Sequence, residues 1–411
     1  MKTSGKTAMR FARTALGLIA LFTLLLTLVY CIPAKWVESR QALSIEMVGE
    51  ESEWAEEGNL YRVISARQDY YTDTVMLERV LAEDEQLSPL GAAMSMNGYG
   101  RYWHGYMVLL RPLLLLFSLQ EIRYILMWAF FLLTGAAVVQ IERKLPGGAC
   151  AFAFLASLVA CYIVIIPTSL QYSWVFLVLL TASLLLLLHC DRMDESGAAL
   201  LFMAVGMVTN FVDLLTVPLL TLGIPLLLLL ELDMHRRGEE RVRVLLRRAV
   251  CCTFAWCVGF GLCWIAKWCI GSIVLGENVF SSAQDRASMW LGIDVAEGNW
   301  RLATLVNNFI TFFLPHGRRM LVWLLAPAAA YAVCLARFRH PHWRRALVLL
   351  PVCAYPYIWY AVFSYHSFCH TWFTYRTQAM TLMGALLFLA ELVDWKRCRE
   401  AFAARRGRKS D

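Results

Sequence analysis

The chain has 411 residues, of which 59% are hydrophobic and 17% charged, and its formal net charge is +7. Its mean hydropathy of +0.55 and its uncharged runs over 175–188 and 217–230 exclude an ordinary soluble globule. Runs of about 20 apolar residues cross a bilayer as helices, because backbone polar groups in lipid must be bonded internally. The sequence therefore predicts an all-α fold, a polytopic transmembrane helix bundle whose partner is the lipid bilayer.

The positive charge is concentrated at the ends of alternate apolar runs. Lys and Arg gather within residues 2–13, 143–144, 236–248, 337–345 and 396–409. This placement follows the positive-inside rule, so it fixes topology and predicts no nucleic-acid partner. We expect a multi-pass protein of a bacterial plasma membrane with both termini in the cytosol.

The first apolar stretch, 13–32, follows a short basic start and is expected to remain as an uncleaved span. Residues 33–121 then form a long outer loop, rich in Glu and Asp, with interfacial helices. Within it, 69–87 has helical character, and 105–119 is an apolar run interrupted by Arg111-Pro112. The whole chain, 1–411, is expected to be a single integral membrane domain.

Alternating basic and non-basic connections divide the rest into spans, about ten in all. With 13–32 and 124–139, these are 149–167, 173–189, 197–212, 214–232, 249–275, 321–337, 346–363 and 377–394. Residues 301–316 contain too short an apolar run to cross and are expected to lie outside as an interfacial helix. The tail, 396–411, is basic and expected in the cytosol.

Asp69 and Asp73 are candidate catalytic residues in the outer loop. Their spacing of four places both carboxylates on one face of a helix, where like charges repel unless a cation, a basic substrate or a shared proton offsets them. A general base or a pair of ligands for a divalent metal ion would use this arrangement. A solvated acidic loop would explain the same residues without chemistry.

Candidate substrate-binding residues follow where the loop returns to the membrane. An aromatic belt explains the Tyr and Trp of 102–106, but His104 and Arg111 suggest contact with a phosphate. Near the carboxy end, His366 and His370 are also four residues apart and precede Arg376, so they could bind a metal or simply lie at the interface. Further candidates on the same side are Gln171 and Asp213.

With these segments placed, the chain resembles the GT-C class of polytopic membrane glycosyltransferases, which use polyprenyl-phosphate-linked sugars. The likeness lies in a first span, a long outer loop with an acidic residue, and an interfacial helix leading into a bundle of spans. Asp73 or Asp69 matches the acidic residue of that class. Segments 69–77, 101–113, 210–213 and 366–376 are also similar to segments of uncharacterised bacterial multi-pass proteins.

The resemblance implies a sugar transfer from a polyprenyl-phosphate donor at the outer leaflet. Asp73 would activate the acceptor hydroxyl with help from Asp69, and cationic groups would stabilise the lipid-phosphate leaving group. The metal candidates are Asp69, Asp73, His366 and His370. Two alternatives stay open: a transporter or lipid flippase, and a non-catalytic envelope assembly protein.

Overall fold

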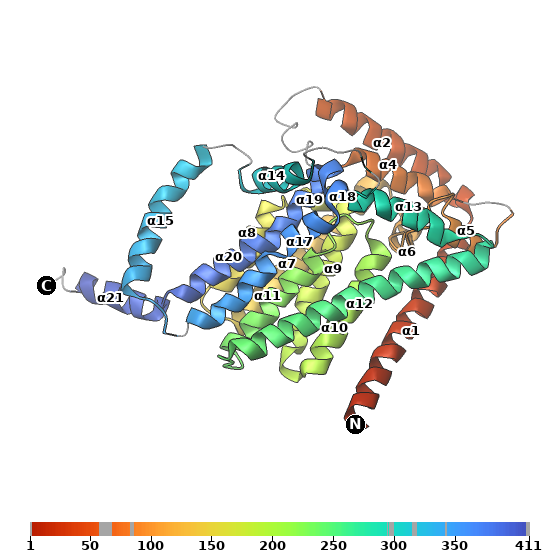
Figure 1. Ribbon diagram of the computed structural model, residues 1–411. Helices are drawn as coiled ribbons and strands as arrows, with labels where there is room; N and C mark the ends of the chain where they lie inside the picture. The colour runs from red at the N-terminus through yellow and green to blue at the C-terminus, as the bar shows by residue number, and fades with distance from the viewer. Residues whose placement is uncertain are drawn as a thin grey trace.

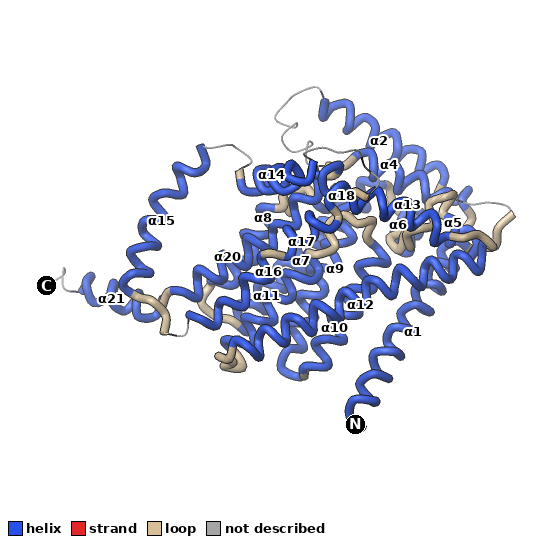
Figure 2. The backbone as a smooth tube through the Cα atoms, viewed as in Figure 1, coloured by secondary structure: helices blue, strands red, loops and turns tan. Residues whose placement is uncertain are grey.

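The computed structural model describes residues 2–56, 68–82, 86–293, 295, 300–314, 319–341 and 343–407. Helices form nearly all of this part of the chain, and no strand occurs in it (Figure 2). The all-α prediction is confirmed. The acidic residues at 57 and 83–85 lie outside the described residues.

Six helical segments among the described residues are long and apolar enough to cross a membrane, so a membrane-embedded protein is supported. They are Gly5–Tyr30, Leu119–Lys144, Leu170–Arg192, Glu195–Val212, Val242–Leu275 and Trp343–Val362. Large apolar side chains on them face outward, including Trp128 and Phe131, which are 65% and 69% exposed. Such surfaces are stable in lipid but not in water.

Three of the four other expected spans are shorter as helices, so the count of ten stays a prediction. The helix α8 (Ala149–Ala160) ends before the expected 167, because the chain turns at Tyr162, whose φ is +60°. The helix α11 (Leu220–His235) begins six residues later than expected, and α20 (Ala379–Leu392) has 14 residues. The helix α15 (Arg319–Arg337) covers the expected span at 321–337.

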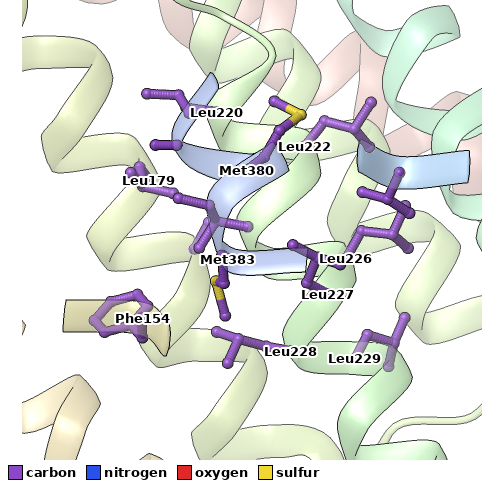
Figure 3. Close-up of a cluster of buried hydrophobic side chains, with 14 of the residues drawn as sticks. Phe154, Leu179, Leu220, Leu222, Leu226, Leu227, Leu228, Leu229, Met380 and Met383 are labelled. Atoms are coloured by element: carbon purple, nitrogen blue, oxygen red, sulfur yellow. The ribbon is translucent and has the colours of Figure 1, made fainter. Parts of the chain in front are cut away.

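The core of the bundle surrounds α11. Every residue from Leu220 to Met234 is buried, which requires neighbours on all sides of that helix. Its leucines pack against Leu179 of α9 (Leu170–His189), Phe154 of α8, and Met380 and Met383 of α20 (Figure 3). This apolar packing holds the spans that carry the polar segments described below.

A second apolar cluster joins the amino-terminal helices to the bundle. It unites α1 (Lys2–Tyr30), α5 (Pro89–Ser95), α6 (Met107–Leu116) and parts of α10 (Glu195–Val212) and α12 (Val242–Leu275). The expected interfacial run at 105–119 is thus a short helix, α6, with Pro112 inside it. It leads directly into α7 (Leu119–Lys144), which starts with a capping box from Ser118 and Glu121.

Several further helices cover one end of the bundle, which we call the loop end (upper side of Figure 1). They are α2 (Glu38–Glu56), α4 (Tyr70–Glu78), α13 (Val279–Leu291), α14 (Trp300–Phe313), α18 (Ser364–Cys369) and α19 (Thr371–Thr374). The opposite, basic end carries the connections 190–194 and 236–241 (Figure 1). The expected interfacial helix at 301–316 corresponds to α14, while 315–316 lie outside the described residues.

The carboxy-terminal half of the bundle is more broken than its sequence suggests. The expected span 346–363 consists of a 3-10 segment, Trp343–Val348, then α16 (Leu349–Cys353) and α17 (Tyr355–Val362). Pro351 and Pro356 lie in these pieces, and proline removes a helix hydrogen bond. The final helix, α21 (Trp395–Gly407), carries the basic tail.

Candidate functional site

Asp73 fixes the start of α9 at the loop end. Its Oδ1 accepts hydrogen bonds from Ser169 Oγ at 3.0 Å and from the Gln171 amide at 2.8 Å. Its Oδ2 accepts one from the Leu170 amide at 2.9 Å. The first amides of a helix have no partner within the helix and carry partial positive charge. A carboxylate from a distant segment therefore caps this helix.

Two opposing effects act on the Asp73 carboxyl, which is only 2% exposed. Burial raises its pKa to about 7, although the amides of Gln171 and Leu170 act in the opposite direction. The Ser169 hydroxyl is the one donor of the three that can reverse its role and accept a hydrogen bond from the protonated carboxyl. The site therefore tolerates both protonation states near neutral pH.

Asp69 lies at the start of α4 and touches the carboxy-terminal part of the chain. Its Oδ1 accepts a hydrogen bond from the Thr72 amide at 3.0 Å, so it is the N-cap of this helix. Its Oδ2 accepts hydrogen bonds from Thr72 Oγ1 at 2.8 Å and from Trp372 Nε1 at 3.0 Å. The tryptophan contact joins two segments that are 303 residues apart.

The carboxy-terminal segment 366–376 packs beside this contact. The His370 ring is 5.0 Å from the Trp372 ring and 4.8 Å from the His366 ring, measured between centroids. Burial lowers the pKa of both histidines, most strongly for His366. Both imidazoles are therefore neutral at physiological pH, and the Nδ1 atom of each is buried without a hydrogen-bond partner among the described residues.

Arg376 contacts the same region. Its guanidinium is fully buried, lies 4.2 Å from the centre of the Tyr172 ring, and donates from Nη1 to the Trp372 carbonyl at 3.1 Å. It also donates from Nε to the Cys161 carbonyl at 3.3 Å. Arginine thus ties α9, the turn after α8 and the 366–376 segment into one unit, which we call the convergence site: Asp69, Asp73, Gln171, Tyr172, His366, His370, Trp372 and Arg376.

Three of the candidate residues, His104, Asp213 and Arg111, make their contacts outside the convergence site. His104, in a left-handed conformation with φ of +54°, bonds through its two nitrogens to the Tyr106 hydroxyl and the Tyr99 carbonyl, both at 3.0 Å. Burial lowers the pKa of His104 to about 3, so it is neutral. Asp213 accepts from the Thr216 amide, and burial raises its pKa to about 7.

Arg111 holds the end of α1. It is fully buried, donates from Nη2 to the Ile32 carbonyl at 2.7 Å, and stacks 4.7 Å from the centre of the Tyr30 ring. Pro112 is accommodated inside α6 directly after it. Arg111 therefore fixes how the first span enters the loop end.

The four candidate metal ligands are not grouped as a metal site in the described residues. The cluster of three potential ligands found there is a different one, Glu231, His235 and Glu391. The thirteen cysteines are all free thiols.

Sequence reasoning missed several partners of the convergence site. Ser169 and the Leu170 amide hold Asp73, and Trp372 holds Asp69. Arg123 and Glu51 form a further ion pair at the loop end, with Nη1 to Oε1 at 2.6 Å and Nη2 to Oε2 at 3.0 Å. The sequence does carry one local signal, because Asp is among the residues preferred at an N-cap. No family model, curated protein or solved structure compared with the chain matches it.

Proposed function

We propose that the chain is a membrane glycosyltransferase-like enzyme that transfers a sugar from a polyprenyl-phosphate donor at the loop end. The hydrogen bond from Trp372 Nε1 to Asp69 Oδ2, at 3.0 Å, carries this proposal. It brings a carboxylate from the first loop against the carboxy-terminal aromatic and imidazole groups. An acid, aromatic rings and neutral imidazoles beside the membrane surface suit a lipid-linked sugar.

Asp69 is the better candidate for the catalytic base. The Asp73 oxygens accept three hydrogen bonds that hold the start of α9. If Asp73 moved to bind substrate, these bonds would break and the helix would lose its cap. Asp69 Oδ1 accepts a single hydrogen bond within the described part of the chain, from the Thr72 amide, which leaves it a free lone pair for an acceptor hydroxyl. We therefore give Asp73 a positioning role and Asp69 the proton transfer.

The proposed step is a displacement at the anomeric carbon. The acceptor oxygen forms the new bond to that carbon as its proton passes to the Asp69 carboxylate. The bond from carbon to phosphate oxygen breaks, and the polyprenyl phosphate leaves with the electron pair. A cation or hydrogen-bond donor near the phosphate stabilises this charge as it grows.

Buried polar atoms without partners offer contacts for the sugar. They are Gln171 Oε1, His366 Nδ1, His370 Nδ1 and Ser367 Oγ, all at the loop end. Leaving such atoms unbonded costs about 1–3 kcal/mol each, so a ligand that bonds them is stabilised. Sugar hydroxyls supply both donors and acceptors.

The test is a transfer assay in membranes supplied with a labelled polyprenyl-phosphate sugar. Asp69→Asn keeps an N-cap for α4, because Asn caps helices as well as Asp does, but it removes the base. We expect transfer to fall by about a hundredfold or more. Asp285→Asn, an exposed carboxylate change on α13 at the same end, is the matched control and should leave transfer unchanged. Wild-type transfer by Asp69→Asn would contradict the proposal.

A further inference from the structure

Glu231, His235 and Glu391 form a compact cluster at the basic end, far from the convergence site. Glu231 and His235 are four residues apart in the last turns of α11, so they share a face. Glu391 comes from the last turn of α20. One ligand atom from each residue lies within 4.8 Å of the others.

The geometry points to a binding site for a divalent first-row transition metal ion, such as Zn²⁺, held by Glu231, His235 and Glu391. His235 Nε2 is 3.4 Å from Glu231 Oε2 and 2.5 Å from Glu391 Oε1. Ligand atoms bound to Zn²⁺ at their usual bond lengths lie about 3.3 Å apart in a tetrahedron. The first distance already fits, and the second needs a small opening of the histidine and glutamate.

A buried oxygen without a partner is the second observation that points to a ligand. Glu231 is 3% exposed, yet its Oε1 has no hydrogen-bond partner among the described residues. A buried carboxylate oxygen left unbonded is costly, and a metal ion held by both oxygens of the Glu231 carboxylate would satisfy it. Imidazole nitrogen and carboxylate oxygen are both ligands that Zn²⁺ accepts.

Arg345 supplies the support that such sites need around their ligands. It donates from Nε and Nη2 to Glu391 Oε2 at 3.1 and 3.0 Å, which leaves Oε1 directed at His235. Hydrogen bonds of this kind orient a ligating carboxylate and tune its affinity. Arg345 also donates to the Met234 carbonyl, so it connects α20 to the end of α11.

The cluster has an entrance from the basic end. The His235 side chain is 41% exposed, whereas those of Glu231 and Glu391 are 4% and 10% exposed. A metal ion and a bound water could therefore enter beside the imidazole. A site with three protein ligands and one open position is able to exchange its metal.

The alternative occupant of the cluster is a proton on His235, which would make a closed ion network of two carboxylates and two cations. The two arrangements differ in stoichiometric metal content, which can be measured. They also differ in the response to Glu231→Gln, which keeps the shape of the side chain but is a poor metal ligand.

The experiment uses full-length protein without a histidine tag, purified in detergent and stripped with a chelator. Zn²⁺ is then added, and bound metal is measured by mass spectrometry after dialysis, together with the shift in thermal unfolding temperature. We expect one equivalent in the wild type and a stabilisation that rises with free Zn²⁺. Glu231→Gln and His235→Ala should each weaken binding by roughly tenfold or more, since even partners behind the ligands have effects of this size.

His189→Ala is the matched control, because His189 is an exposed histidine at the end of α9 and not part of the cluster. It should bind Zn²⁺ as the wild type does. Binding of less than one equivalent in the wild type, or equal binding by the wild type, Glu231→Gln and His235→Ala, would overturn the proposal. Because the cluster lies away from the loop end, neither result bears on sugar transfer.

Discussion

At the scale of single residues, Asp73 shows how one carboxylate can organise two distant segments. Each of its oxygens faces a backbone amide at the start of α9, and one also faces Ser169. No neutral side chain of the same shape can do this, because an amide group replaces one acceptor with a donor. The demand for two acceptor oxygens is therefore specific to Asp.

We predict that Asp73→Asn destabilises the protein by about 1–3 kcal/mol, since its amide nitrogen must face the Leu170 or the Gln171 amide. Thermal unfolding in detergent measures this. Ser169→Ala, which removes a single donor to the same carboxylate, should cost less, about 1 kcal/mol. An Asp73→Asn protein as stable as the wild type would show that α9 does not depend on this cap.

His104 makes a separate prediction about pH. Burial lowers its pKa to about 3 from the ordinary 6.5. Between these two pH values, His104 binds a proton in the unfolded chain but not in the folded protein. Its contribution to stability is therefore lost as the pH falls from 6.5 towards 3. Asp73 and Asp213 act the other way, because their raised pKa values make the folded state hold protons between about pH 4 and 7.

A variant isolates the histidine from these carboxyls. Asn tolerates the left-handed backbone at position 104 and does not titrate, so His104→Asn keeps the conformation without the proton. Between pH 7.5 and 5.5 the wild type should lose about 1 kcal/mol of unfolding free energy relative to this variant. Parallel pH profiles for the two proteins would show that His104 is not held neutral.

At the scale of elements, α10 and α12 pack closely against each other. A side-chain carbon added at Gly206 would lie 2.3 Å from the Trp256 carbonyl oxygen, and one added at Gly259 would lie 2.1 Å from that of Met203. Both distances are far shorter than any van der Waals contact. Small residues at such crossings let the backbones approach and stabilise helix pairs in membranes.

Gly206→Ala and Gly259→Ala should each destabilise the protein by about 1–3 kcal/mol, because the two helices must separate to admit the methyl group. Gly261→Ala provides the control on the same helix, since nothing lies within 4 Å of its added carbon. Thermal unfolding of the three variants checks the order. Equal stabilities for Gly259→Ala and Gly261→Ala would contradict the packing.

The helices were more predictable from the sequence than their contacts. Apolar runs predicted α1, α7, α9, α10 and α12, because a membrane-spanning helix is recognised by its length and its hydropathy alone. The breaks were less visible: α8 ends at a turn through Tyr162, and α11 starts late because Asp213 caps the turn before it through the Thr216 amide. Such ends depend on backbone geometry and on single hydrogen bonds, which periodicity does not report.

The candidate site was predictable in its parts but only partly in its assembly. Grouping residues by side of the membrane placed Asp69, Asp73, Gln171, His366, His370 and Arg376 together, and the structure has these residues in one contact network. The same grouping also included His104, Arg111 and Asp213, which make other contacts. Residues must lie on the same side of the membrane to be in contact, but long-range packing decides which of them are.

At the scale of the whole molecule, the two ends of the bundle differ in charge. The basic end carries Arg236, Arg237 and Arg248, paired in part with Asp191 and Asp233. The loop end carries the convergence site. The positive-inside rule then predicts that the basic end lies in the cytosol and the convergence site on the opposite face of the membrane.

Epitope tags test this orientation. One is inserted after Gly98 and another after Gly238, two exposed turn positions at the loop end and the basic end. The labelling reagent must not cross the membrane that holds the protein. We expect it to label the tag after Gly98 in intact cells, and to label the tag after Gly238 only after the cells are lysed. The reverse pattern would place the convergence site in the cytosol and rule out the proposed outer-leaflet reaction.

The most direct test of the central claim measures the rate of sugar transfer by purified protein in four forms: wild type, Asp69→Asn, Trp372→Phe and the double variant. Phe keeps a ring at position 372 but removes the Nε1–H that bonds Asp69. If the two residues act as one unit, Trp372→Phe alone lowers kcat by about tenfold, and the double variant is no slower than Asp69→Asn. Transfer at the wild-type rate by all three variants would contradict the claim that these two segments form one catalytic site.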